Sequence, residues 1–142
     1  LQVNNNCLNC HTPVDPADGA VRVPAGQLEL QDGLSPDEPD HFHAYRELLV
    51  TDNLQILENG ALVDATQVIG QDVDGNDILD VIPIAPPART NGARASSDFF
   101  DRFNDPADLH FNILSQAERR LVAEWLDVGA QYYNNPFDAP AN

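Results

Sequence analysis

The sequence predicts a mainly α-helical domain with long loops and one inserted β-hairpin. Three observations support this: amphipathic helical patterns near residues 40–50 and 115–132, alternating runs around an Asp-Gly turn, and a loop-forming composition. The 142 residues include 11 prolines and 8 glycines, which favour long connections between few regular elements. This length is typical of one core, so we expect residues 1–142 to form a single domain.

The charge balance excludes several classes of function. The chain has 7 Lys plus Arg against 23 Asp plus Glu, a net charge of −16 with neutral histidines. Such an acidic surface repels nucleic-acid phosphates and anionic lipids, which excludes both as main partners. No apolar run reaches the roughly 20 residues that cross a bilayer. Residues 1–6 lack a signal-peptide pattern, so we expect any export signal to have been removed.

Both cysteines lie in the motif Cys7-Leu8-Asn9-Cys10-His11. Cys-x-x-Cys-His is typical of covalent attachment of c-type haem. Two thiols three residues apart on a helical turn can reach the two vinyl groups of one porphyrin edge, and the next histidine can bind the iron. A disulfide would close a very small loop and would leave His11 unexplained. The motif is also compatible with a zinc site or a free dithiol.

The segment after the motif is predicted to be rich in loops, from residue 12 to 38. Short extended pieces are expected at 20–23 and 27–31. A helix is expected at about 40–50, with Asp40 as its N-cap. Its apolar stripe is expected to consist of Phe42, Tyr45, Leu48 and Leu49.

A β-hairpin is predicted within residues 61–84, with strands at 65–70 and 78–82 around Asp74-Gly75. The tract 72–77 resembles a calcium loop. It does not fit an EF-hand, because Asp77 stands at the sixth position and Pro83 at the twelfth. We expect a solvated turn there, and calcium binding at 72–77 stays open.

The last third contains two predicted helices after a connector at 83–92. The first begins near Ser96 or Ser97, and its phenylalanines are expected in the core or on the porphyrin face: Phe99, Phe100 and Phe103. The second has a capping box of Ser115 and Glu118. Its predicted buried stripe is Ala117, Leu121, Trp125, Val128 and Tyr132. Residues 134–140 contain prolines and cannot continue it.

A haem motif near the N-terminus and a capped helix near the C-terminus resemble the cytochrome c family. The resemblance implies a cytochrome c-like helical fold around one covalent haem, with His11 as one iron ligand. In that family a loop before the last helix usually supplies a methionine as the second ligand, but this chain has no methionine. His110 lies in the corresponding loop, so bis-histidine ligation by His11 and His110 is expected. His41, His43 and an open iron are the alternatives.

Further haem contacts are expected from a few side chains. Propionates need cationic or hydrogen-bonding partners. Arg46 is the best candidate among the seven basic residues, followed by Arg89 and Arg94. Tyr45 and Trp125 are expected in the core, with contacts to the haem edge.

Two stretches resemble monohaem modules of a bacterial group related to the haem domains of hydrazine synthase alpha subunits. They are residues 43–49, and residues 114–118 running on to 124–137. Such modules often end larger exported proteins. Similar cytochrome domains accompany secreted polysaccharide-degrading systems, where they are thought to supply electrons to copper oxygenases. Hydrazine synthesis itself is not implied, because it needs more haems than one motif supplies.

The sequence therefore predicts an electron-transfer protein with one haem c, not an enzyme, in the periplasm or outside the cell. We expect a monomer or a module of a larger protein, and a redox partner with a basic docking face. Two histidine ligands and the acidic surface predict a lower potential than that of His/Met carriers. A peroxidase-like enzyme with an open sixth position, and a haem sensor or structural module, are the alternatives.

Overall fold

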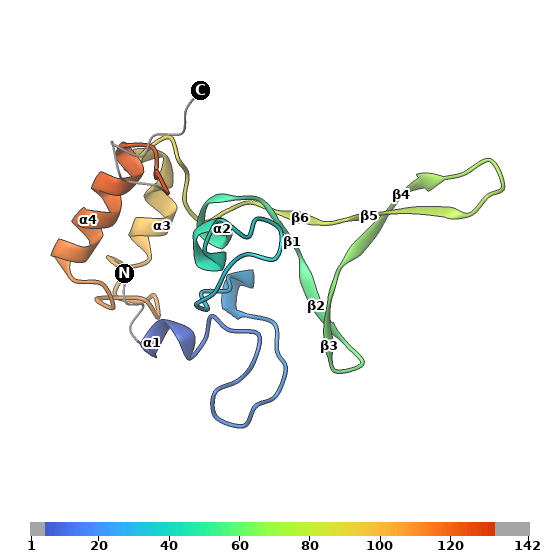
Figure 1. Ribbon diagram of the computed structural model, residues 1–142, viewed down its shortest axis with the longest axis horizontal. Helices are drawn as coiled ribbons and strands as arrows, with labels where there is room; N and C mark the ends of the chain where they lie inside the picture. Colours follow the sequence, from blue (N-terminus) through green and yellow to red (C-terminus); the bar gives the residue numbers. More distant parts are fainter. Residues whose placement is uncertain (1–4, 133–142) are drawn as a thin grey trace. The chain divides into compact units, whose positions relative to one another are not determined.

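The computed structural model describes residues 5–132 and divides the chain into two compact units, Leu1–Pro86 and Pro87–Asn142 (Figure 1). The first unit contains the short helix α1 (Asn5–Leu8), the helix α2 (His43–Leu49) and all the described strands. The second unit contains the helices α3 (Ser97–Asp101) and α4 (Gln116–Asp127). Each unit is described by itself below.

The prediction of a mainly α, cytochrome c-like fold is wrong. The structure is 26% helical and 21% strand, and its strands form small antiparallel sheets. The helical content is low because α2 has only 7 residues and α4, the longest described helix, has 12. We expected one hairpin, within residues 61–84, but residues 52–84 fold into two hairpins and a closing pair of strands.

Two of the described strand pairs join neighbours in the sequence, and the third joins the two ends of this region. Strand β2 (Gln55–Glu58) pairs with β3 (Ala61–Asp64), and the turn between them is Asn59-Gly60. Both turn residues have positive φ, 51° and 82°, which the tight turn of a two-residue hairpin requires. Strand β1 (Asp52–Asn53) pairs with β6 (Pro83–Ile84), which brings the two ends of this region together.

The predicted hairpin around Asp74-Gly75 is confirmed. Strand β4 (Thr66–Gln71) pairs antiparallel with β5 (Asp77–Val81), with Thr66 opposite Val81. At the tip, the Asp72 carboxylate accepts hydrogen bonds from the backbone N–H groups of Asp74 and Asn76. The side-chain and backbone bonds from Asn76 are the main cause of a lowered pKa at Asp72. Residues 72–76 therefore form the expected exposed turn. Figure 1 shows the hairpin extending from the rest of its unit.

The N-terminal segment differs from the prediction in three places. Val21 forms only an isolated bridge with Val14, so 20–23 is not a strand. Residues 27–31 form no strand either, because the chain turns through the 3₁₀ helix η1 (Ala25–Gln27). The N-cap of α2 is Phe42, without a side-chain hydrogen bond, so the Asp40 cap is wrong.

The second unit begins its helical part with the 3₁₀ helix η2 (Ala93–Ser96), directly before α3. The helix predicted from Ser96 or Ser97 is therefore confirmed. Phe103, two residues after the end of α3, is 7% exposed. The other buried apolar residues of this unit are Ala88, Val122, Leu126 and Ala130.

The capping box that starts α4 is also confirmed. Glu118 N–H donates to Ser115 Oγ, and Ser115 N–H donates to the Glu118 carboxylate. The predicted buried stripe is wrong: Leu121 and Val128 are each 60% exposed, whereas Val122 and Leu126 are buried. The buried face is rotated by one residue, and the helix ends before Val128 and Tyr132.

The expectations for residues 1–6 and for the tail 134–140 fall wholly or mostly outside the described residues. Within 5–132, no helix has the length and apolar character needed to cross a membrane.

Candidate haem-attachment site

The Cys-x-x-Cys-His motif forms one helical turn. Cys7 lies in α1, and its carbonyl accepts hydrogen bonds from Cys10 N–H at 3.2 Å and His11 N–H at 2.9 Å. In such a turn, side chains three and four residues apart share one face. The local fold therefore presents both thiols and the imidazole on one side of the chain, as attachment to one porphyrin requires.

Both cysteines are free thiols, Cys7 half-buried and Cys10 exposed. Burial and the neighbouring Cys10 raise the pKa of the Cys7 thiol. Both thiols are therefore available for a covalent bond to another group.

The His11 side chain has a defined tautomer. Its Nδ1 lies 3.1 Å from the Leu28 carbonyl oxygen. A carbonyl oxygen only accepts, so Nδ1 must carry the proton and donate it. The proton on Nδ1 leaves the lone pair on Nε2, which is the form of histidine that binds a metal. Sequence reasoning missed Leu28, because any residue offers the same backbone carbonyl.

The chain from residue 25 to 30 holds the motif in place. Cys10 carbonyl accepts from Ala25 N–H at 2.9 Å, and His11 carbonyl accepts from Leu30 N–H at 2.9 Å. Together with the bond to Leu28, these contacts fix His11 at its backbone and at its ring.

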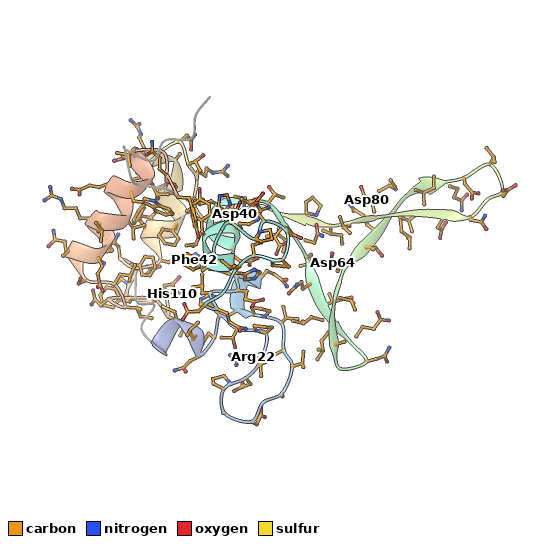
Figure 2. All side chains as sticks on the ribbon, in the orientation of Figure 1. Arg22, Asp40, Phe42, Asp64, Asp80 and His110 are labelled. Atoms are coloured by element: carbon orange, nitrogen blue, oxygen red, sulfur yellow. The ribbon has the colours of Figure 1, made fainter. Side chains whose placement is uncertain are left out.

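Arg22 closes the loop that follows the motif (Figure 2). Its guanidinium donates to the Asn9 carbonyl at 2.6 Å and the Thr12 carbonyl at 3.3 Å, and pairs with Asp15 at 2.6 Å. Arg22 therefore secures the backbone on both sides of His11, a role that no pattern in the sequence indicated.

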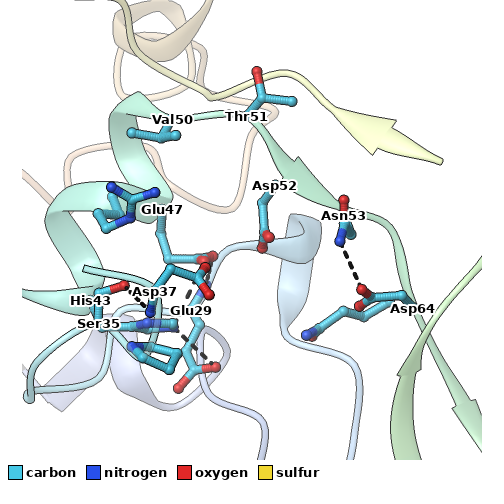
Figure 3. Close-up of a pocket in the computed structure, with 13 residues that line it drawn as sticks. Glu29, Ser35, Asp37, His43, Glu47, Val50, Thr51, Asp52, Asn53 and Asp64 are labelled. Atoms are coloured by element: carbon cyan, nitrogen blue, oxygen red, sulfur yellow. Dashed lines mark hydrogen bonds and ion pairs between the residues drawn. The ribbon is translucent and has the colours of Figure 1, made fainter. Parts of the chain in front are cut away.

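An acidic pocket of about 260 Å³ lies in the same unit (Figure 3). Its ionisable side chains come from the loops before α2, from α2 itself and from strands β1 and β3, and they are Glu29, Asp37, His43, Arg46, Glu47, Asp52 and Asp64. His43 Nε2 lies 3.4 Å from Glu29 Oε2 and 3.7 Å from Glu47 Oε1. This nitrogen faces two carboxylates, and His43 as an iron ligand stays an alternative prediction.

The Glu47 side chain is only 9% exposed, less than those of His43 and Glu29 beside it. Burial raises the pKa of Glu47 to about 7, and neighbouring Asp52 and Glu29 add to the rise, whereas the Glu29 N–H opposes it. That N–H donates to Glu47 Oε2 at 2.9 Å. Glu47 therefore changes charge near neutral pH. No pattern in the sequence distinguishes it from other acidic residues.

His110 lies in the second unit, where its ring packs edge-on against Phe103 with the ring centroids 5.9 Å apart. Its Nδ1 lies 2.7 Å from Asp108 Oδ1. The backbone and side-chain hydrogen bonds of His110 lower the pKa of Asp108, so the carboxylate is ionised and accepts from Nδ1. His110 thus has the same tautomer as His11. Its role as the second ligand stays a prediction.

The remaining predicted haem contacts are divided between the two units. Arg46 lines the acidic pocket, and Tyr45 packs edge-on against His41 at 5.2 Å between ring centroids. In the second unit, Trp125 is half-buried and its Nε1–H donates to the Gln131 carbonyl at 3.2 Å. Arg89 and Arg94 are both exposed. Their contacts with haem stay predictions.

Within residues 5–132, no group of three or more His, Cys, Asp and Glu side chains is arranged to hold a metal ion. Structural zinc needs about four such ligands, whereas haem iron takes only one or two from the protein.

No protein-family model matches the chain, and no curated protein or solved structure shows significant similarity to it. The resemblance to haem modules therefore depends only on the residues of this chain that carry it.

Proposed function

We propose that this protein transfers electrons through one haem c bound covalently by Cys7 and Cys10, with His11 as an iron ligand. The observation that carries the proposal is the hydrogen bond from His11 Nδ1 to the Leu28 carbonyl, at 3.1 Å. It selects the tautomer in which Nε2 binds a metal. The two free thiols on the same helical turn supply the covalent attachment.

When bound, haem supplies an iron that gains and loses one electron. The chain's own residues hold and tune it. Leu28 and Leu30 fix the His11 ring and backbone, and Arg22 secures the loop on either side. A rigid ligand keeps the iron surroundings nearly unchanged between the two charge states, which favours rapid electron exchange.

The second ligand that we propose is His110. Its support is the bond between Nδ1 and the Asp108 carboxylate, which directs the imidazole lone pair to Nε2. A second histidine, unlike methionine, favours the ferric state and lowers the reduction potential. With both axial positions filled, the protein would carry electrons rather than bind a substrate at the metal.

The proposed partner is a redox protein with a basic docking face. The net charge of −16 supports this, because it attracts a basic surface, and salt screens that attraction. Covalent haem attachment needs reduced thiols outside the cytoplasm, so we propose a periplasmic or extracellular location.

The first test is to produce the protein in bacteria that attach haem in the periplasm and to record its pyridine haemochrome spectrum after acid-acetone extraction. We expect haem to stay with the protein, and a Cys7→Ala/Cys10→Ala variant to lose it. A correctly matured wild-type protein without covalent haem would refute the proposal.

The second test addresses ligation. We expect His110→Ala to convert a low-spin, six-coordinate spectrum into a high-spin one. His43→Ala is the matched control, because its Nε2 faces carboxylates, and it should leave the spectrum low-spin. A low-spin His110→Ala protein would show that another residue binds the iron.

A further inference from the structure

One peptide group joins His11 to the acidic pocket. The carbonyl of the Leu28–Glu29 peptide accepts the hydrogen bond of His11 Nδ1 at 3.1 Å. The N–H of the same peptide donates to Glu47 Oε2 at 2.9 Å. The imidazole, the peptide and the carboxylate therefore form one continuous hydrogen-bonded chain. Figure 3 shows Glu29 and Glu47 among the residues that line the acidic pocket.

Hydrogen bonds in such a chain polarise one another. A carboxylate that accepts the peptide N–H draws this proton toward itself and leaves more negative charge on the peptide oxygen. The more negative oxygen then takes a stronger hydrogen bond from His11 Nδ1, which makes Nε2 a stronger donor. A stronger donor stabilises the higher charge of ferric iron, so the potential falls.

We propose that Glu47 is a positioning residue that tunes the haem ligand His11 through the Leu28–Glu29 peptide group. The inference rests on the proposed function, because it requires iron on His11. It adds a residue far from the motif in sequence, on helix α2, to the machinery that sets the reduction potential.

The surroundings of Glu47 also make this tuning depend on pH. The ionisable groups facing it are Glu29 from the preceding loop, His43 from its own helix and Asp52 from strand β1. The burial of the side chain and the negative charges of Asp52 and Glu29 bring its titration to near neutral pH. The potential should therefore fall as pH rises through this range, because only ionised Glu47 polarises the peptide strongly.

The test compares reduction potentials of the haem-bearing wild type, Glu47→Gln and Glu29→Gln at pH 5 and pH 9. Glutamine at 47 keeps an oxygen acceptor for Glu29 N–H but carries no charge. Glu29→Gln is the matched control, because it removes a charge from the same cluster and leaves the backbone hydrogen bond to Glu47 in place.

At pH 9 we expect Glu47→Gln to favour reduction about tenfold more than wild type, a rise of about 59 mV for one electron. Glu29→Gln should shift the potential clearly less. At pH 5 the Glu47→Gln and wild-type potentials should converge. Equal shifts for both variants at pH 9 would overturn the inference, since charge alone would then explain them.

A readout on the same samples separates this inference from the proposed function. The Glu29 amide resonance in ¹⁵N spectra should follow the titration of Glu47 and stop doing so in Glu47→Gln. A protein without haem refutes the proposed function. If haem is bound and the Glu29 amide follows the titration of Glu47, but Glu47→Gln and wild type have the same reduction potential, only the tuning by Glu47 is overturned.

Discussion

Glu47→Gln should make the protein more stable above neutral pH while changing little at acidic pH. Burial raises the pKa of Glu47 in the folded protein to about 7, from 4.5. The folded state therefore keeps a proton that the unfolded chain releases. The resulting stabilisation is complete below about pH 4.5 and is lost as the pH rises through about 7. Glutamine imitates the protonated side chain at every pH, so the variant avoids this loss.

The size of this change in stability follows from the shift in the pKa of Glu47. At about 1.4 kcal/mol per pH unit, moving the pKa from 4.5 to about 7 changes the free energy of unfolding by at most about 3.5 kcal/mol. No large discount for solvent applies, because the side chain is 9% exposed. Between pH 5 and pH 8, the difference in the free energy of unfolding between variant and wild type should grow by about 2.5 kcal/mol.

Urea unfolding followed by circular dichroism at both pH values measures this difference. Glu58→Gln is the control, because Glu58 is exposed on strand β2 and its substitution removes the same formal charge. The control should follow the wild type at both pH values. A Glu47→Gln difference that is the same at pH 5 and pH 8 would refute the reasoning.

Three substitutions in the second unit test its packing, each measured by urea unfolding. Leu126→Ala should destabilise by about 2 to 5 kcal/mol, because Leu126 is fully buried, and a loss below about 1 kcal/mol would contradict this core. Ser115→Ala removes the capping box and should lower the free energy of unfolding by about 1 kcal/mol. Ser115→Asp keeps a side-chain acceptor and should retain most of that stability. Gly92→Ala should destabilise, because φ is 114° and the added Cβ meets Asp127 Oδ1 at 3.0 Å. Adding Asp127→Ala to Gly92→Ala should recover only the stability lost through the contact of the new Cβ with Asp127. Complete recovery would show that the positive φ imposes no strain.

The sequence predicted the features that depend on neighbouring residues. The Asp74-Gly75 turn and the Ser115 capping box each have a local physical cause, and both appear in the structure. The Asn59-Gly60 turn carried an equally strong signal that we did not use, and it would have predicted the second hairpin.

The wrong predictions concern features that tertiary packing determines, namely which face of a helix is buried and where a helix begins. The apolar pattern of α4 fits two faces one residue apart, and the surrounding unit buries Val122 and Leu126 rather than Leu121. The helix at 40–50 lost its first turn, because Phe42 is extended and takes the N-cap position in place of Asp40. A pattern of apolar residues cannot choose between such alternatives by itself.

The contacts around His11 show a different limit of sequence reasoning. The motif predicts what His11 binds, but its Nδ1 partner is a backbone carbonyl 17 residues away. The carboxylate beyond that peptide lies a further 18 residues along the chain from Glu29. Backbone groups are the same for every residue type, so no residue pattern indicates which of them will face the histidine.

The two histidines proposed as ligands differ in what holds Nδ1, and this difference leads to a last prediction. A neutral carbonyl holds His11, whereas the Asp108 carboxylate holds His110 at 2.7 Å. A full negative charge beside Nδ1 makes Nε2 a stronger donor to a metal than a neutral carbonyl does. Asp108→Asn keeps an oxygen acceptor but loses this charge, so the reduction potential should rise.

Asp105→Asn is the matched control for that substitution, since it removes the same charge from the same segment, where the Asp105 carboxylate accepts the Ala107 N–H. If His110 binds iron, Asp108→Asn should raise the potential clearly more than Asp105→Asn, in potentiometric titrations at pH 8. Equal shifts would mean that only the overall charge acts, and a low-spin His110→Ala protein would then assign the second ligand to another residue. A larger shift for Asp108→Asn would show instead that the acidic residues of this chain lower the potential mainly through the imidazoles that they hold.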